Sequence, residues 1–363
     1  MKIYSKALME NLKSISTVVA DFVFIDCTDE NNYALYVSTD VQAMKVPLEI
    51  TDVSEEEKQI YVINKVEFTH LIPYVNEFLV LGADYSYNVN NDAFKGKFES
   101  NEGYAEELES RKMLFDHESE YEDFMEVTPS IMNGISCGSI FVAPDSIKSS
   151  ERYLDIQSSK VFSYSKMKIY INDIDVKSDG IFSSEVIKAL ESLGVGAVVK
   201  NNNDSYLLTN AQRSIFIYFS TPNDVDFHPV LSEQFQGKIN NVKTFNKFTF
   251  NINELRNKLD YISFYSQKNP NCMCFLTVKD DKVSLSTDEN TFVDVPLVES
   301  NKTEEFETMS VPFDCSSLQL ITTKVGKECE NLNMFVSSKE ENKLILITFG
   351  DTNETVIIAK LNL

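Results

Sequence analysis

Apolar and polar positions follow one another along this chain in an order that recurs. Residues 248–259, FTFNINELRNKL, predict a short apolar strand, a polar turn residue and a helix with apolar residues at helical spacing. Residues 311–322, VPFDCSSLQLIT, have the same order. Each segment is followed by stretches in which apolar and polar residues alternate, which predicts strands with one buried face. The chain therefore repeats a unit of strand, helix and about three strands.

Further copies of this unit are present along the chain. Six units begin near residues 1, 61, 125, 180, 247 and 310. The copy near residue 125 has two glycines in its helix, which weakens the helical prediction. The spacing of about sixty residues exceeds the 20–50 residues of the common solenoid repeats.

One such unit cannot bury its helix and its small sheet alone, whereas two units side by side can. Helices packed on one face of antiparallel sheets give an α+β fold. We therefore predict three domains, residues 1–122, 123–235 and 236–363, each of ordinary domain size. Two connectors favour this division: residues 99–126, with eleven acidic side chains, and residues 228–246. For residues 99–126 a solvated connector is the simpler interpretation.

The formal net charge of −23 argues against nucleic acid, because phosphate binding requires basic surface. The argument holds only if the charge is spread evenly, and several basic residues lie on predicted helices opposite the apolar stripe. In the first helix Leu8, Leu12, Ile15 and Val19 form the stripe. The basic positions that we select as a candidate surface are Lys6, Lys13, Lys188, Arg256, Lys258 and Lys327. For any one of them, a solvated surface charge is the simpler interpretation.

Motifs for chemistry are missing from the sequence. It has no G-x-x-x-x-G-K-[ST] phosphate loop, no H-E-x-x-H zinc motif and no G-x-S-x-G nucleophile turn. His70, His117 and His228 are isolated from one another and from cysteines. We expect no catalytic residue, no metal and no cofactor, and an enzyme is not expected. The N-terminus has no signal-peptide pattern and no apolar run is long enough to cross a bilayer, so we expect a cytoplasmic protein without membrane partners.

Taken together, the six units, the acidic charge and the length resemble the DNA polymerase sliding clamps in their three-domain bacterial form, the β subunit. The resemblance covers nearly the whole chain. It is strongest in the last 120 residues, where FNINELRNKLDYIS, CFLTVKDDKVSLST, MSVPFDCSSLQLI and TVIIAKLNL follow the order of the family's third domain. The departures from the family pattern suit a phage protein or a divergent version.

The resemblance implies a fold and a function. Three pseudo-repeated clamp domains would place antiparallel sheets outside and helices along the inside of a ring, and two chains would close it head to tail as a homodimer. The ring would encircle duplex DNA without sequence preference, receive it from a clamp loader and tether the DNA polymerase as a processivity factor. The selected basic residues would face the DNA. A clamp-fold tether for transcription or repair proteins is the alternative, followed by an unrelated α+β enzyme.

The resemblance also implies a hydrophobic pocket for partner peptides between the second and third domains. The residues that match it by position are Tyr164, Lys168, Ile169, Leu344, Leu346, Ile358, Leu361 and Leu363. The family's usual proline in the C-terminal segment is replaced here by Lys360. Core packing of a last strand is the alternative interpretation of Leu361 and Leu363.

Overall fold

The structure is a computed structural model of the chain. It describes residues 1–39, 42–89, 93–116, 118–165, 168–202, 205–210, 215–220, 233–269, 272–280, 282–288, 290–327, 329–350 and 352–361. His117, His228 and Leu363 therefore lie outside the described residues. The chain divides into two compact units. Unit 1 comprises Met1–Asn133 and Ile181–Asn223, and unit 2 comprises Gly134–Gly180 and Asp224–Leu363.

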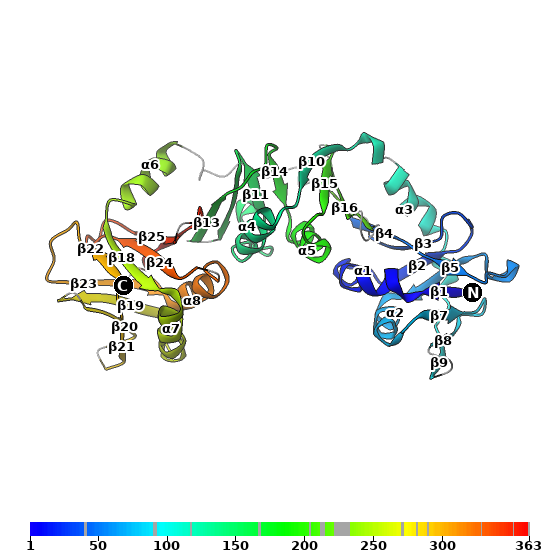
Figure 1. The fold of residues 1–363 in the computed structure, drawn as a ribbon, viewed down its shortest axis with the longest axis horizontal. Coiled ribbons are helices and arrows are strands. Elements are labelled where there is room, and N and C mark those ends of the chain that lie inside the picture. The colour runs from blue at the N-terminus through cyan, green and yellow to red at the C-terminus, as the bar shows by residue number, and fades with distance from the viewer. Residues whose placement is uncertain are drawn as a thin grey trace. The chain divides into compact units, whose positions relative to one another are not determined.

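Unit 1 contains two antiparallel sheets (Figure 1). Its strands are β1 (Lys2–Tyr4), β2 (Phe22–Asp26), β3 (Ala34–Ser38), β4 (Gln42–Pro47), β5 (Ile50–Thr51), β6 (Ile60–Asn64), β7 (Phe78–Leu81), β8 (Ser86–Val89), β9 (Phe94–Lys97), β10 (Glu122–Glu126), β15 (Val198–Asn201), β16 (Ser205–Asn210) and β17 (Ile215–Ser220). One sheet has the order β5-β1-β7-β8-β9 and the other β10-β15-β16-β17-β4-β3-β2-β6. Its helices are α1 (Ser5–Thr17), α2 (Lys65–Leu71), α3 (Glu107–Asp116) and α5 (Ser184–Leu193).

Unit 2 has a similar construction. Its strands are β11 (Leu154–Gln157), β12 (Lys160–Ser165), β13 (Lys168–Asp173), β18 (Asn246–Asn251), β19 (Met273–Lys279), β20 (Lys282–Ser286), β21 (Phe292–Val295), β22 (Glu299–Asn301), β23 (Thr308–Asp314), β24 (Asn331–Val336), β25 (Leu344–Phe349) and β26 (Thr355–Ala359). One sheet runs β11-β12-β13-β26-β25-β24-β18-β22 and the other β21-β20-β19-β23. Its helices are α6 (Glu233–Val242), α7 (Ile252–Ser266) and α8 (Cys315–Lys324). Strand β14 (Gly180–Phe182) and helix α4 (Pro129–Ser139) cross the boundary between the units.

The predicted sixfold repeat is confirmed. Strands β1, β6, β10, β14, β18 and β23 lead into α1, α2, α4, α5, α7 and α8, and at least three strands follow each helix. The polar turn residue of the pattern is the helix N-cap in several units. Asn64, Asn251 and Asp314 end their strands, and their side chains accept hydrogen bonds from the first backbone N–H groups of the helix. The sharp change from strand to helix is therefore written locally in the sequence.

Each large sheet combines strands from two predicted domains. In unit 1, β17 pairs with β4 in the register Ile217↔Met44. In unit 2, β13 pairs with β26 in the register Tyr170↔Val356. The predicted second domain thus contributes strands to both units, and the three-domain division stays a prediction.

The interpretation of residues 99–126 as a solvated connector is wrong, because this segment forms helix α3, which packs on a sheet. The second connector also contains a helix that packs on a sheet, α6. In unit 1, Leu108 of α3 is fully buried against Phe24 and Tyr36 on the sheet face opposite α1 and α2 (Figure 1). Lys112 of α3 pairs with the buried Asp26 at 2.5 Å. Burial alone would raise the pKa of Asp26, but the bonds from Lys112 and Thr28 hold it below its usual value. The many acidic residues of this segment suggested a solvated connector, although a few apolar contacts and one ion pair with a buried carboxylate hold it on the sheet.

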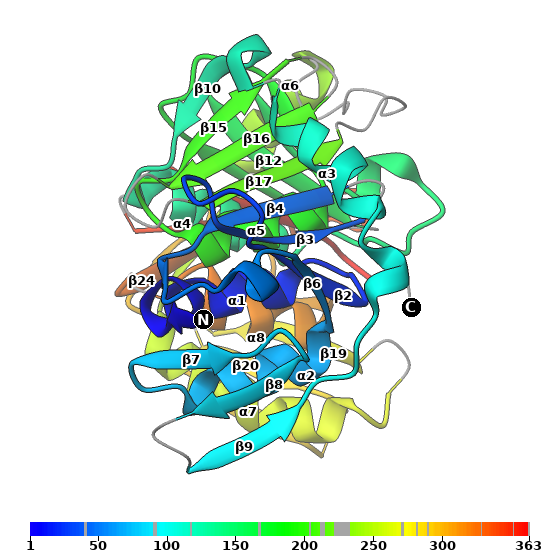
Figure 2. The same ribbon diagram turned by 90° about the vertical axis from the view of Figure 1, so that its right-hand side faces the viewer.

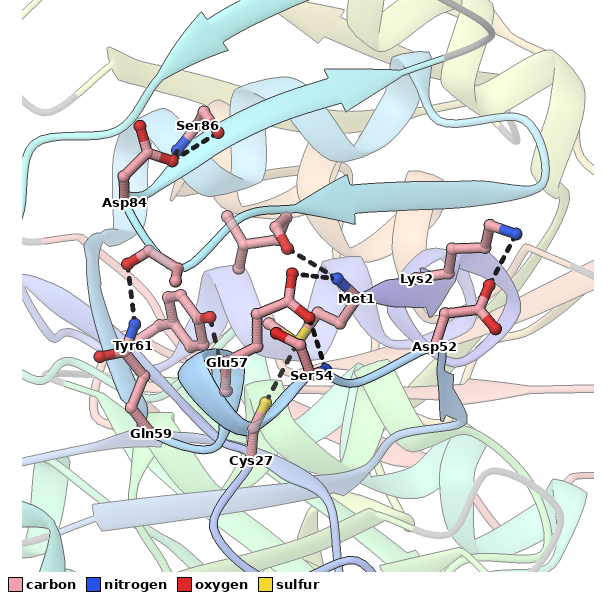
Figure 3. A network of polar contacts seen from close by, with 12 residues as sticks. Met1, Lys2, Cys27, Asp52, Ser54, Glu57, Gln59, Tyr61, Asp84 and Ser86 are labelled. Atoms are coloured by element: carbon pink, nitrogen blue, oxygen red, sulfur yellow. Dashed lines mark hydrogen bonds and ion pairs between the residues drawn. The ribbon is translucent and has the colours of Figure 1, made fainter.

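Contacts near the first strand hold β1 between its neighbours (Figure 3). The ammonium group of Met1 donates to Oε1 of Glu57 at 2.5 Å and to the carbonyl of Leu81 at 3.0 Å. Lys2 forms an ion pair with Asp52 at 2.7 Å. These contacts connect the start of β1 to the segment before β6 and to the last residue of β7. The five-stranded sheet is therefore joined to the loop that leads into the second unit of the repeat.

The glycines of α4 are explained by close packing on the sheet of unit 2. A Cβ atom on Gly138 would lie 2.5 Å from Cδ1 of Leu154 and 3.3 Å from Cδ1 of Tyr170. The Ser163 hydroxyl also donates to the Gly138 carbonyl at 2.7 Å. A side chain at this position would separate the helix from the sheet, so the glycine that weakens the helix prediction is needed for packing.

We predict that Gly138→Val lowers the free energy of unfolding by about 1–3 kcal/mol, the usual cost of overpacking a core. Denaturant unfolding of the full chain measures this change. Gly237→Ala in α6 is the control, because its Cβ would meet nothing within 4 Å, and it should be neutral or stabilise by up to about 1 kcal/mol. Equal stability of Gly138→Val and wild type would contradict the packing explanation.

Candidate nucleic-acid and partner surfaces

Helix α1 presents two of the selected lysines to solvent. Lys6 and Lys13 are exposed, whereas Leu8 and Ile15 are fully buried. The predicted stripe is wrong at Val19, which is 76% exposed because the helix ends at Thr17. Leu12 is half-buried. The helix therefore has an apolar face toward the unit and a free basic face.

Polar residues replace part of the predicted apolar stripe where α1 meets α5. The hydroxyl groups of Ser14 and Ser192 lie 2.7 Å apart and are both buried. The side chain of Asn11 is also buried and donates to the carbonyl of Ala7 at 2.6 Å. Small polar side chains let the two helices approach closely, which the hydrophobic pattern did not predict.

The remaining selected basic residues fall into two groups. Lys188 on α5 and Lys327, just after α8, are exposed, and the stripes beneath them are buried as predicted. Arg256 is different, because its Nη2 donates to the carbonyl of Thr322 at 2.6 Å and so connects α7 to the end of α8. Lys258 is half-buried and lines a cavity beside β21. The structure therefore leaves Lys6, Lys13, Lys188 and Lys327 as the freely exposed members of the set.

The helices of the repeat carry a different charge balance from the rest of the protein. Together α1, α2, α4, α5, α7 and α8 contain seven basic and six acidic residues. The whole chain has 33 basic and 56 acidic residues. The acidic excess therefore lies outside these helices, which leaves their surfaces nearly neutral with exposed lysines.

The face of the large sheet in unit 2 that α6 covers gathers part of the predicted peptide pocket. Ile169 and Leu346 are buried with Phe162 and Ile357, and Tyr164 and Leu344 lie half-buried at the edge of the same cluster. Helix α6 covers this cluster through Ile239, Val242 and Phe245. Four of the predicted residues are thus on one face.

The structure separates Lys168 and Ile358 from these four residues. Lys168 lies directly opposite Ile358 across the β13–β26 ladder, whereas Ile169 lies opposite Ile357. Successive strand residues point to opposite faces, so Lys168 and Ile358 lie on the sheet face opposite the one that α6 covers. Lys168 there pairs with Asp314 at 3.4 Å. The prediction selected residues by their match in position to the family's pocket and did not take this alternation into account.

A cavity of about 400 Å³ adjoins the cluster. Its walls are α6 and the turn between β24 and β25, and its lining residues are Phe235, Lys238, Asn241, Val242, Phe245, Glu341, Asn342, Lys343 and Leu344. Sequence reasoning missed the α6 residues, although Phe235, Ile239 and Val242 stand at helical spacing.

The predicted pocket residue Leu361 lies elsewhere, because its backbone N–H donates to the Pro312 carbonyl at 3.0 Å. The segment after β26 therefore runs beside β23.

Two edge strands carry exposed aromatic residues. In unit 1, β9 is an edge strand (Figure 2), and the rings of Phe94 and Tyr74 lie 5.5 Å apart with about half of each side chain exposed. In unit 2, β21 is an edge strand, and Phe292 is 60% exposed. Beside it Tyr261 and Phe264 of α7 are 51% and 67% exposed. Large exposed aromatic groups at unpaired strand edges are typical of protein interfaces.

Neither a metal-binding cluster nor a membrane-spanning helix is found in the part of the chain that the structure describes. No cluster of three His, Cys, Asp or Glu side chains there is suited to a metal ion. No helix there has both the length and the apolar character needed to cross a bilayer.

Comparison with known proteins identifies the fold. No protein-family model and no curated protein sequence matches the chain. The β subunit of DNA polymerase III from Thermotoga maritima matches with a TM-score of 0.75 and 14% identity, over 100% of this chain and 99% of that chain. The sliding clamp of Pseudomonas aeruginosa matches with a TM-score of 0.75 and 10% identity, over the same shares. The Helicobacter pylori β clamp, whose structure holds a DNA ligase peptide, matches with a TM-score of 0.71 and 13% identity over the full length of both chains. The chain therefore has the fold of the bacterial DNA polymerase sliding clamps, along its whole length.

Proposed function

We propose that the protein is a DNA sliding clamp that encircles duplex DNA and tethers a replicative DNA polymerase. The observation that carries this proposal is the full-length match of all six repeated units to the sliding-clamp fold. The near-neutral helices support it, because a protein that slides must contact phosphates weakly. An acidic exterior would discourage DNA from binding elsewhere. The proposed role is a non-catalytic one.

The proposed partners are duplex DNA, a DNA polymerase, a clamp loader and a second copy of the chain. The proposed DNA-facing residues are Lys6, Lys13, Lys188 and Lys327, together with Lys258. The cavity next to α6, with Tyr164, Ile169, Leu344 and Leu346, is the proposed peptide site. Its apolar walls and two lysines suit a peptide with apolar side chains near an acidic group.

The second copy would join through the two aromatic edges. We propose that β9 of one chain adds to β21 of the other, because both edges are unpaired and each carries an exposed phenylalanine. The strands are also complementary in charge, since β9 contains Lys95 and Lys97 and β21 contains Asp294. The opposite edge, β23, is partly occupied by the chain segment at Leu361. Head-to-tail pairing of this kind closes into a ring rather than a filament when the rotation permits it.

Retention on circular DNA tests the function. Subunits dissociated by dilution are concentrated in the presence of nicked circular DNA, and bound protein is separated by gel filtration at high salt. We expect protein to remain on the circle and to leave once the DNA is cut to a linear form, because only a closed ring is held by topology. Equal release from circular and linear DNA would contradict encirclement.

A further inference from the structure

Lys360 is a buried cation that contacts a turn some twenty residues earlier in the chain. The side chain is 8% exposed, and its Nζ donates to the carbonyl of Ser337 at 2.8 Å and of Lys339 at 3.2 Å. Its backbone N–H donates to the carbonyl of Lys343 at 2.7 Å. Burial lowers the pKa of Lys360, and the nearby Glu304 carboxylate opposes this effect. The residue therefore contacts both ends of the segment that joins β24 to β25, which we call the 337–343 turn.

Glu304 holds the same turn from a second side. Its Oε1 accepts from the Ser337 hydroxyl at 2.6 Å, and its Oε2 accepts from the Ser338 backbone N–H at 2.6 Å. The side chain of Asn246 donates to Oε2 at 2.8 Å. Burial would raise the pKa of Glu304, but these hydrogen bonds lower it. Two charged groups of opposite sign thus converge on Ser337 and its neighbours.

The turn that these two groups hold forms one wall of the cavity beside α6. Glu341, Asn342 and Lys343 lie in the turn and line the cavity, followed by Leu344 at the start of β25. Among the described residues the hydrogen-bond partners of the Lys360 ammonium group are two carbonyls. Burying an ammonium group in this way is costly, and an apolar side chain of similar volume would be cheaper in stability. The contacts of Lys360 place the turn, and with it the wall.

We propose that Lys360, together with Glu304, is a positioning residue that sets the shape of this cavity and hence its affinity for a peptide bearing apolar side chains. Only the nature of the ligand rests on the proposed function; the position of the turn does not. Lys360 does not line the cavity, so it acts through the turn and not by touching the ligand.

Hydrogen exchange of the full-length protein tests the positioning. In Lys360→Met the amides of Ser338, Lys339 and Asn342 should exchange at least about tenfold faster than in the wild type. Lys279→Met, an exposed lysine of the same unit, should leave these rates unchanged. A folded Lys360→Met protein with wild-type exchange in the turn would overturn the proposal. If Lys360→Met does not fold, Glu304→Gln gives the same test, because it weakens the contacts to Ser337 and Ser338.

Peptide binding tests the consequence. The probe is a peptide selected from a random decapeptide library on the wild-type protein, whose binding is lost in Phe235→Ala. We expect its affinity to fall about tenfold in Lys360→Met and to be partly restored in Lys360→Arg, which keeps a donor and a charge. Unchanged affinity in Lys360→Met would overturn the proposed role in binding. Failure to select any peptide, with exchange in the turn still faster in Lys360→Met, would refute the peptide site and leave the positioning intact.

Discussion

Phe292→Asp is expected to raise the dissociation constant of the proposed dimer by at least about a hundredfold. Phe292 is a large exposed ring on the unpaired edge of β21, and loss of a central aromatic residue from an interface commonly costs 2–4 kcal/mol. Each 1.4 kcal/mol corresponds to a factor of ten in affinity. The new carboxylate would also lie two residues from Asp294, which adds like-charge repulsion within the edge.

Light scattering over a concentration series measures this change. Phe94→Asp, on the edge proposed as the complement, should weaken the dimer by a similar factor. Ile147→Asp is the matched control, because Ile147 is an apolar side chain of unit 2 that is 95% exposed and lies in neither edge. A wild-type chain that stays monomeric at micromolar concentration would contradict the ring. A stable dimer that tolerates both phenylalanine substitutions would place the contact elsewhere.

Replacing Lys6, Lys13, Lys188 and Lys327 together by glutamate should greatly reduce the protein retained on circular DNA while the dimer persists. All four side chains are exposed on or next to helices of the repeat, opposite buried apolar faces. Each lost phosphate contact lowers the slope of log affinity against log salt by about 0.9. We therefore expect at least a tenfold loss of loading when dilute protein is concentrated with circular DNA at physiological salt, and a shallower dependence of loading on salt. Loading at several salt concentrations, each followed by the high-salt gel filtration, measures both.

A variant with the same change in net charge separates position from overall charge. Lys148, Lys177, Lys279 and Lys339 are exposed and lie outside the six helices, so glutamate at these four positions should reduce retention far less. Equal losses in the two quadruple variants would show that only the total charge matters. Wild-type retention in the first variant would show that the helices do not face the DNA.

The sequence alone determined the repeat and the fold class, because the relevant signals are local. The change from period two to helical spacing and the polar residue at the junction both lie within a dozen residues, as in the segment around Asn251. The stripe of α7, from Ile252 to Ile262, is buried as its spacing predicted. The resemblance to sliding clamps rested on the same local signals in order along the chain, and the solved structures confirm the fold.

The tertiary structure decided which residues act together, because sheet pairing and close packing join distant segments. The chain alone gave no reason to connect Lys360 with Glu304, whereas the strand alternation that separates Lys168 from Ile169 was available in the sequence and was overlooked. The sequence did not predict that α3 packs on a sheet, because most of its residues are polar or charged. Its packing depends on Leu108 and on the ion pair between Lys112 and Asp26, which lie about ninety residues apart. In the sequence, Gly138 only weakened the helix prediction. The structure explains it, because a Cβ atom at this position would lie too close to the side chain of Leu154. Periodicity along the chain reports which face of an element is buried, whereas what it is buried against depends on contacts that only the folded chain creates.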